Sequence, residues 1–294
     1  MAGATSTWTG VAGGDFAAAG NWDGEIVPSA LDTALFAGSA GTVTGDGTVL
    51  HIAIGDAASP YPGTWTFLGG SLAAGGEAIA GGLPDAVGFF GDTLLDGEIL
   101  NAAGGTTAIA GPAGVTVTAR AGAQVTSGGD IVGGSGGQVG SLVLTGSGTD
   151  WIEQSGPVVD GNLSGFLILG SLAGSSGTLA VDDGAQLLTG GGAVLGAAAG
   201  SCGSAAVAAG SWTASGGLQV GVGGAGSLRV DAGTLTSGAA TMLGVAAGSG
   251  GTLVIAGSGP GDPGLLTNAG DLVVGAAGTG TLAAGENGVV TAGG

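Results

Sequence analysis

The sequence predicts an all-β fold, a parallel β-helix (β-solenoid) whose coils take about 25 residues each. Three observations support this: an internal repeat, short apolar runs that alternate with period 2, and 73 glycines among 294 residues. Glycine and the 8 prolines together reach the share at which aperiodic chains are usually disordered. The apolar fraction of 44% argues against disorder, because disordered chains are poor in hydrophobic residues.

The repeat units begin at a glycine followed by a short apolar segment. They start at Gly114, Gly140, Gly177, Gly203, Gly226, Gly251 and Gly280, with spacings of 26, 37, 26, 23, 25 and 29 residues. The 37-residue unit carries an insertion around 151–166. Each unit holds two or three apolar-x-apolar runs bounded by turn residues, without a sustained helical stripe. We therefore expect short strands that turn at glycine corners, where φ > 0 is accessible, and that stack on the next coil.

The first 113 residues are less regular but consist of similar segments. Short strands are expected at Thr42–Thr44, Thr48–Ile54, Thr64–Leu68, Val87–Phe90 and Thr93–Leu95. Most aromatic residues lie here, namely Trp8, Phe16, Trp22, Phe36, Tyr61, Trp65, Phe67, Phe89 and Phe90. Because a solenoid end exposes strand edges and open core, we interpret 1–40 as an aromatic-rich cap, 41–113 as irregular coils and 114–294 as regular coils of one continuous domain. Roughly 12 coils would form a rod of about 55–60 Å.

Charge and composition exclude two classes of partner. The chain has no lysine, two arginines (Arg120 and Arg229) and 21 acidic residues, for a formal charge of −19. Such a chain cannot neutralise a phosphate backbone, so no nucleic acid is expected as a partner. Direct membrane insertion is not expected either, because the uncharged run 190–217 is mostly Gly, Ala and Ser. Met1 is followed by no basic region or apolar stretch, so no signal peptide is predicted.

Short sequence motifs that suggest catalysis are weak in a chain this rich in glycine. Gly221-x-Gly223-x-x-Gly226 and Gly133–Gly137 match nucleotide-binding and nucleophile-elbow patterns, but chance explains both. His51, the sole histidine, is interpreted as a strand residue, although a triad with Asp46 or Asp56 is conceivable. Cys202, the sole cysteine, is expected to be a small buried residue.

Carboxylates are the abundant reactive groups. Asp182-Asp183, Asp231 and Glu286 fall at similar corners after a strand, mainly as solvated turn residues. Ca²⁺ is the one cofactor considered, because a column of acids offers it oxygen ligands; no metal-binding or cofactor-binding residue is assigned. The Thr-x-Thr pairs Thr42/Thr44 and Thr116/Thr118 are too few for an ice-binding array. No catalytic residue is assigned, and no enzyme is expected.

Two segments carry family-like patterns. The first contains Thr7–Gly10, Gly14–Phe16, Asn21-Trp22, Pro28 and Asp32–Phe36. The second, G-S-W…G-L-x-V-G…G-x-G-x-L-x-V, occurs at Gly210–Trp212, Gly217–Gly221 and Gly224–Val230, with variants at 149–151 and 267–275. Over about 5–36 and 114–294 the chain resembles autotransporter-like passengers of type V secretion and PEP-CTERM-sorted surface proteins. The resemblance implies export by a Gram-negative bacterium, a right-handed parallel β-helix and a structural, often adhesive, surface role.

We therefore expect a non-enzymatic extracellular β-solenoid, a surface stalk or filament building block with an adhesive role. The expected partners are further copies, stacked head-to-tail or laterally, and host or matrix glycans. The last unit ends mid-pattern at Gly294, so either the chain is part of a longer protein or its last coil is a stacking surface. The alternative is a polysaccharide-binding or polysaccharide-cleaving β-helix, with a groove where Asp residues meet Trp65, Tyr61 or Trp151.

Overall fold

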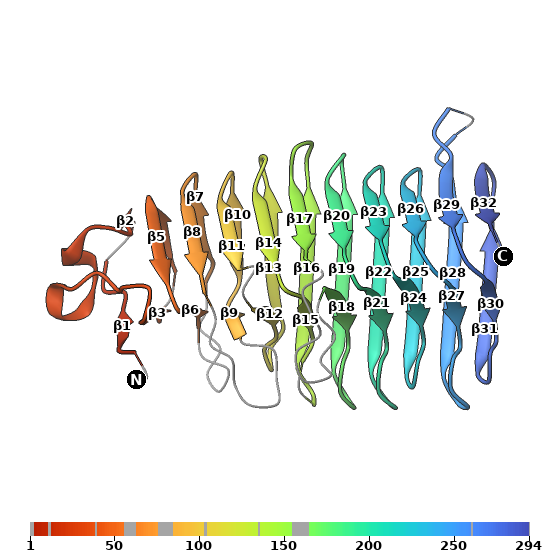
Figure 1. Cartoon of the computed structure of the whole chain (residues 1–294), viewed down its shortest axis with the longest axis horizontal. Helices are drawn as coiled ribbons and strands as arrows, with labels where there is room; N and C mark the ends of the chain where they lie inside the picture. Colours follow the sequence, from red (N-terminus) through yellow and green to blue (C-terminus); the bar gives the residue numbers. More distant parts are fainter. Residues whose placement is uncertain are drawn as a thin grey trace.

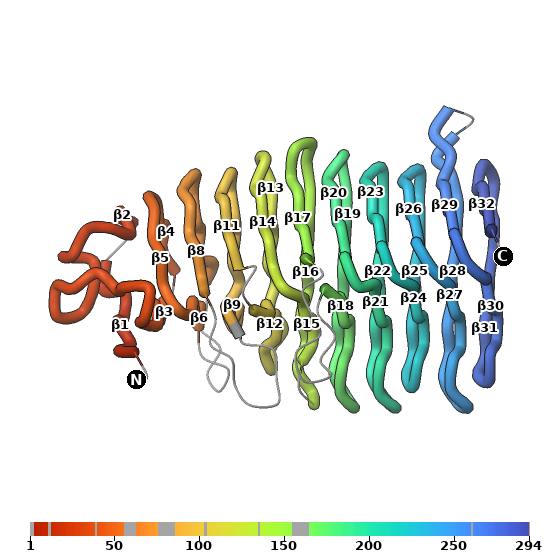
Figure 2. Tube along the Cα trace, viewed as in Figure 1, coloured from red at the N-terminus to blue at the C-terminus, as the bar shows by residue number. Residues whose placement is uncertain are grey.

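The computed structural model describes residues 3–10, 13–38, 40–55, 63–75, 85–102, 105–134, 136–154, 165–259 and 261–293. Within them the chain is a parallel β-solenoid, which confirms the predicted fold class (Figure 1). Three sheets of 11, 11 and 10 strands run along its axis, and neighbouring strands within each sheet come from successive coils. Figure 2 shows the coils following one another in sequence order from the N-terminal to the C-terminal end.

The described strands divide into three sheets. The first sheet contains β1 (Thr5–Thr7), β3 (Thr33–Phe36), β6 (His51–Ile54), β9 (Asp85–Phe89), β12 (Thr106–Ile109), β15 (Asp130–Val132), β18 (Phe166–Leu169), β21 (Gly192–Leu195), β24 (Gly217–Val220), β27 (Thr241–Leu243) and β30 (Leu272–Val274). The second sheet contains β2 (Gly14–Asp15), β4 (Gly41–Thr44), β7 (Trp65–Leu68), β10 (Thr93–Asp96), β13 (Val115–Arg120), β16 (Val139–Thr145), β19 (Ser176–Asp182), β22 (Cys202–Ala208), β25 (Ala225–Asp231), β28 (Gly250–Ala256) and β31 (Thr279–Ala284). The third sheet contains β5 (Asp46–Val49), β8 (Ser71–Ala74), β11 (Ile99–Ala102), β14 (Gln124–Ser127), β17 (Asp150–Glu153), β20 (Gln186–Thr189), β23 (Ser211–Ala214), β26 (Thr234–Ser237), β29 (Gly264–Asn268) and β32 (Gly288–Ala292).

From β3 onward the chain visits the first, second and third sheets in turn, so each coil contributes one strand to each sheet. The single strand expected at Thr48–Ile54 is in fact two, because the chain turns a corner at Leu50 between β5 and β6. The sheets hold at most 11 described strands instead of the roughly 12 coils expected, because the cap and insertions use residues outside the strands. At the usual strand spacing, 11 strands span about 48 Å.

Aromatic rings close the N-terminal end, as the cap interpretation predicts. The short 3-10 helices η1 (Ala19–Asn21) and η2 (Asp23–Glu25) lie between β2 and β3, beyond β5 in Figure 1. Trp8, Phe16, Trp22 and Phe36 are all buried and pack ring against ring, with centroids 5.0–6.4 Å apart. The Trp22 indole N–H donates to the backbone carbonyl of Phe16 at 2.8 Å, so its polar atom is satisfied inside the cap.

Two glycine columns shape the corner between the first and second sheets. From β15 onward, the glycine that follows each first-sheet strand has a positive φ of 65° to 77°; these are Gly133, Gly170, Gly196, Gly221, Gly244 and Gly275. The glycine that begins the next inward-facing run does not share this conformation; these are Gly140, Gly177, Gly203, Gly226, Gly251 and Gly280, all in register. A Cβ at these six positions would lie 2.1–2.4 Å from a backbone atom. Positive φ therefore explains the first column, whereas close backbone approach explains the second.

One hydrophobic cluster runs through the solenoid from Trp8 to Leu266. The strands alternate buried and solvent-facing residues, as in β25, where Gly226, Leu228 and Val230 point inward. Among the described residues, no helix is long and apolar enough to cross a membrane.

Candidate functional site: carboxyls inside the solenoid

The two arginines lie on the surface of the second sheet. Arg120 Nη2 is 2.8 Å from Asp96 Oδ2, and Arg229 pairs with Asp231 two residues further on. Their side chains are about half exposed, at 51% and 55%. Each arginine is thus engaged by a neighbouring carboxylate on the outer face.

The carboxylates at the predicted acidic corners have different partners. Asp231 is held by Arg229, and Asp183 accepts a hydrogen bond from the Thr145 hydroxyl at 3.3 Å. Partial burial, together with the charge of Asp183, raises the pKa of Asp182. Within the described ranges, no three His, Cys, Asp or Glu side chains gather as a metal-binding group.

His51 and Cys202 both begin strands. His51 opens β6 in the first sheet, whereas Asp46 opens β5 in the third and accepts the backbone N–H of Ser71 at 3.0 Å. Asp56, the other candidate triad member, lies outside the described residues. The prediction that Cys202 is buried is wrong: Cys202 is exposed, because Gly203 takes the inward position and strand alternation turns its neighbour outward.

The aromatic groove expected for a polysaccharide site does not form from its predicted tryptophans. Trp65 and Trp151 are core residues, 4% and 0% exposed, while Tyr61 lies outside the described residues. The outer face of the third sheet nevertheless carries a depression of about 300 Å³. Side chains of Asp150, Ile152, Gln186, Leu188, Ser211 and Thr213 come from three successive strands there.

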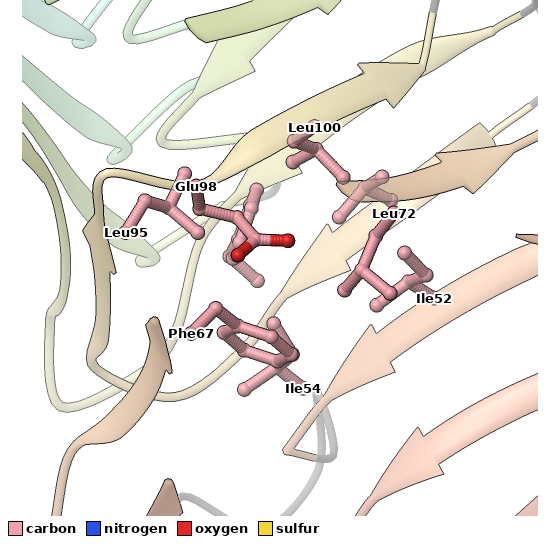
Figure 3. A pocket seen from close by; sticks show the side chains of 9 residues that line it. Ile52, Ile54, Phe67, Leu72, Leu95, Glu98 and Leu100 are labelled. Carbon is pink, nitrogen blue, oxygen red and sulfur yellow. The ribbon is translucent and has the colours of Figure 1, made fainter. Parts of the chain in front are cut away.

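Sequence reasoning missed three buried carboxyls, and Glu98 is the first. It lies at the corner between β10 and β11, only 1% exposed, and its Oε2 accepts the backbone N–H of Gly70 at 2.7 Å. Figure 3 shows its carboxyl among apolar side chains of a small interior pocket, including Phe67, Leu95 and Leu100. Burial raises the pKa of Glu98 to about 7, although the Gly70 N–H acts in the opposite direction.

The other two, Asp130 and Glu153, meet at the inner corner between the third and first sheets. Asp130 opens β15 and Glu153 closes β17, and each is 1% exposed. Burial raises the pKa of both groups, and the charge of Asp130 raises that of Glu153 further. The Trp151 indole N–H donates to Asp130 Oδ2 from within the core.

Buried hydroxyls surround this pair. Ser127 closes β14, three positions before Asp130, and Thr107 is the cross-strand neighbour of Asp130 on β12. Ser127 is the cross-strand neighbour of Glu153 on β17. Both hydroxyl residues are fully buried and lie near enough to Asp130 to lower its pKa, against the effect of burial. We call these four side chains, Thr107, Ser127, Asp130 and Glu153, the inner acidic corner.

A sequence signal for the inner acidic corner exists in the strand alternation. In Asp150-Trp151-Ile152-Glu153 the apolar Trp151 must point inward, so Glu153 two residues later points inward as well. In Asp130-Ile131-Val132 the inward Val132 places Asp130 inside by the same rule.

Comparison of the chain with protein-family models, curated proteins and solved structures finds no match in any of the three. Functional inference therefore rests on the fold and on the chemistry of the side chains described above.

Proposed function

We propose that the chain is a non-enzymatic, extracellular structural solenoid, a rigid acidic stalk or filament building block on the outer surface of a Gram-negative bacterium. The observation that carries this proposal is continuity. Three sheets and one hydrophobic cluster extend through the described coils, so bending or breaking the rod must disrupt several strand pairings at once. The autotransporter-like segments support the surface location, and the net charge of −19 keeps neighbouring lateral faces apart.

Self-association is the second part of this proposal. The last described coil, formed by β30, β31 and β32, has a strand neighbour on one side only. Its inward-column residue Val274, in register with Leu243, is 45% exposed, whereas Leu243 is fully buried. We propose that this face takes a further coil, which a second copy must supply when the 294-residue chain is studied alone.

Light scattering across protein concentration and Ca²⁺ tests the association. We expect reversible association that Val274→Asp abolishes, because a carboxylate would be buried in the stacked interface. Val289→Asp is the matched control: Val289 is similarly exposed, at 48%, but pairs with the outward-facing Leu265. A wild-type chain that stays monomeric at all concentrations, or equal loss in both variants, contradicts stacking on this face.

Glycan binding is the alternative function, and the depression on the third sheet is the observation that favours it. Asp150, Gln186 and Thr213 offer polar groups beside the apolar Ile152 and Leu188, a combination suited to sugar hydroxyls and CH faces. Screening against uronate and neutral glycans, with and without Ca²⁺, tests this function. Binding that Gln186→Ala weakens would favour it over a purely mechanical role.

A further inference from the structure

We propose that the inner acidic corner binds one hard divalent cation, Ca²⁺, inside the solenoid. This site is distinct from the acidic surface corners at Asp182-Asp183 and Asp231, and it does not depend on the structural role proposed above. Its four side chains come from three successive coils, so a bound ion would tie those coils together from within.

The strand register brings the four side chains to one place. Thr107 and Asp130 are cross-strand neighbours in the first sheet, and Ser127 and Glu153 are cross-strand neighbours in the third. Between β14 and β15 only Gly128 and Gly129 separate the two sheets. All four positions face the interior, where exposure is 0–1%.

Five oxygen atoms of this cluster form no hydrogen bond of good geometry, although Thr107, Ser127 and Glu153 lie close enough to Asp130 for side-chain hydrogen bonding to shift its pKa. They are Thr107 Oγ1, Ser127 Oγ, Asp130 Oδ1 and both carboxyl oxygens of Glu153. Buried polar atoms are rarely left in this condition, because losing water without a replacement costs free energy. Here hydroxyl and carboxyl oxygens gather at one place, and a cation can bind all of them at once through their lone pairs.

The charge of the corner points the same way. The chain has no lysine, and both arginines form ion pairs on the outer surface. The two buried carboxyls are therefore neutralised either by protons, which the raised pKa of each favours, or by a cation from outside the chain. All the side-chain ligands are oxygens, which argues against Zn²⁺ because Zn²⁺ prefers nitrogen and sulfur ligands. Mg²⁺ is also disfavoured, because it usually retains several waters for which a buried corner has little room. Ca²⁺ accepts six to eight oxygen ligands in irregular geometry, which suits five side-chain oxygens supplemented by carbonyls or water.

The equivalent corner in later coils provides an internal comparison. There the Trp212 indole N–H donates to Thr189 at 3.4 Å, and the Thr241 hydroxyl donates to Asn268 at 2.7 Å. Those neutral side chains satisfy one another inside the protein. Among these equivalent corners between the third and first sheets, the one to which we assign the ion holds both carboxyls and oxygens without a hydrogen bond of good geometry.

Refolding is the appropriate test, because the interior is accessible before the coils close. The full chain is unfolded, refolded with Ca²⁺ or with a chelator, and dialysed exhaustively before its metal content is measured. We expect one retained Ca²⁺ per chain and a higher melting temperature in the Ca²⁺-refolded protein. Glu153→Gln should lose this ion, with affinity reduced by at least about 10–100-fold, the range typical even for residues one shell further out.

Two further variants separate the inner site from surface binding and from misfolding. Ser127→Ala removes one hydroxyl ligand without adding or removing charge, and we expect weaker but measurable Ca²⁺ retention. The double variant Asp182→Asn with Asp183→Asn should retain the ion as the wild type does. Tb³⁺ supplies an optical readout, because Trp151 touches Asp130 and should sensitise its luminescence.

The proposal is overturned if the Ca²⁺-refolded wild type holds no tightly bound ion and melts at the same temperature as the chelator-treated protein. That result would show that protons alone neutralise Asp130 and Glu153. Retention that is unchanged in both Glu153→Gln and Ser127→Ala, but lost in the surface double variant, would equally overturn it.

Discussion

The N-terminal coils and the repeat coils fill the same kind of cross-section in different ways. In the second sheet, strands β2, β4, β7 and β10 have two to four residues, whereas β16, β19, β22, β25 and β28 have seven. Large rings pack against one another in the N-terminal core, whereas the repeat core holds mostly aliphatic side chains beside the in-register glycines, with Trp151 and Trp212 as its two large rings. The difference shows that the regular coils depend on glycines that let backbones approach closely, whereas the cap depends on large side chains that fill its core.

Removing an aromatic ring tests whether ring packing stabilises the N-terminal coils. Phe36 is fully buried and contacts five other rings, those of Trp8, Phe16, Trp22, Trp65 and Phe67. We expect Phe36→Ala to destabilise the N-terminal coils by about 3–5 kcal/mol. Hydrogen exchange should show lost protection in β3 and β7 while β22 and β25 remain protected, because each coil contacts mainly its neighbours.

Phe36→Leu is the control, and it should cost less because most of the buried volume remains. Equal loss of protection along the whole solenoid would contradict the separation into a ring-filled end and a glycine-fitted repeat.

Adding a methyl group at one of the in-register glycines tests whether close backbone approach stabilises the repeat coils. A Cβ at Gly251 would lie 2.1 Å from the Val220 carbonyl oxygen and 2.4 Å from the Gly244 nitrogen. Gly251→Ala must therefore move backbone, and we expect it to cost about 3 kcal/mol, near the upper end for overpacking. The measurement is the denaturant midpoint of the variant against wild type.

The neighbouring Gly250 is the matched control, because a Cβ there meets no atom within 4 Å and its φ is not positive. Gly250→Ala should be neutral or stabilise by up to about 1 kcal/mol through the unfolded chain. Similar losses in both variants would show that glycine content as such, and not the close backbone approach at Gly251, governs the repeat.

These contrasts also show what sequence reasoning can and cannot reach. The 25-residue period and the glycine-bounded apolar runs are enough to predict a parallel solenoid, because both are local patterns. The cap is predictable from the clustering of Trp8, Phe16, Trp22 and Phe36. The role of the leading glycines is not, because the atom that excludes a side chain at Gly251 belongs to a residue 31 positions earlier, Val220.

The buried carboxyls illustrate a different gap. Asp130 and Glu153 are 23 positions apart in the chain, and their meeting depends on the register of β14 with β17 and of β12 with β15. Alternation alone indicates that each points inward, but not that they share a corner with Thr107. Glu98 has no such alternation signal, because it lies in the corner itself, between β10 and β11.

Glu98 tests how well the N-terminal coils exclude water, because its pocket lies within them. Burial raises its pKa from 4.5 to about 7, with a further contribution from the charge of Asp46. A folded-state pKa above the unfolded value means that the folded chain holds the proton more tightly. The stabilisation is therefore fully present below about pH 4.5 and is lost as pH rises through about 7.

We expect the wild type to lose on the order of 3 kcal/mol of stability from this group across that window. Glu98→Gln should lack this component while still accepting the Gly70 N–H through its amide oxygen. Denaturation at several pH values in this range gives the difference in stability between the two proteins. The other carboxyls contribute equally to both proteins, so their effects cancel in that difference. Parallel stability curves for wild type and variant would mean that Glu98 is hydrated in the folded chain, and that the ring-filled coils are more open to water than their burial indicates.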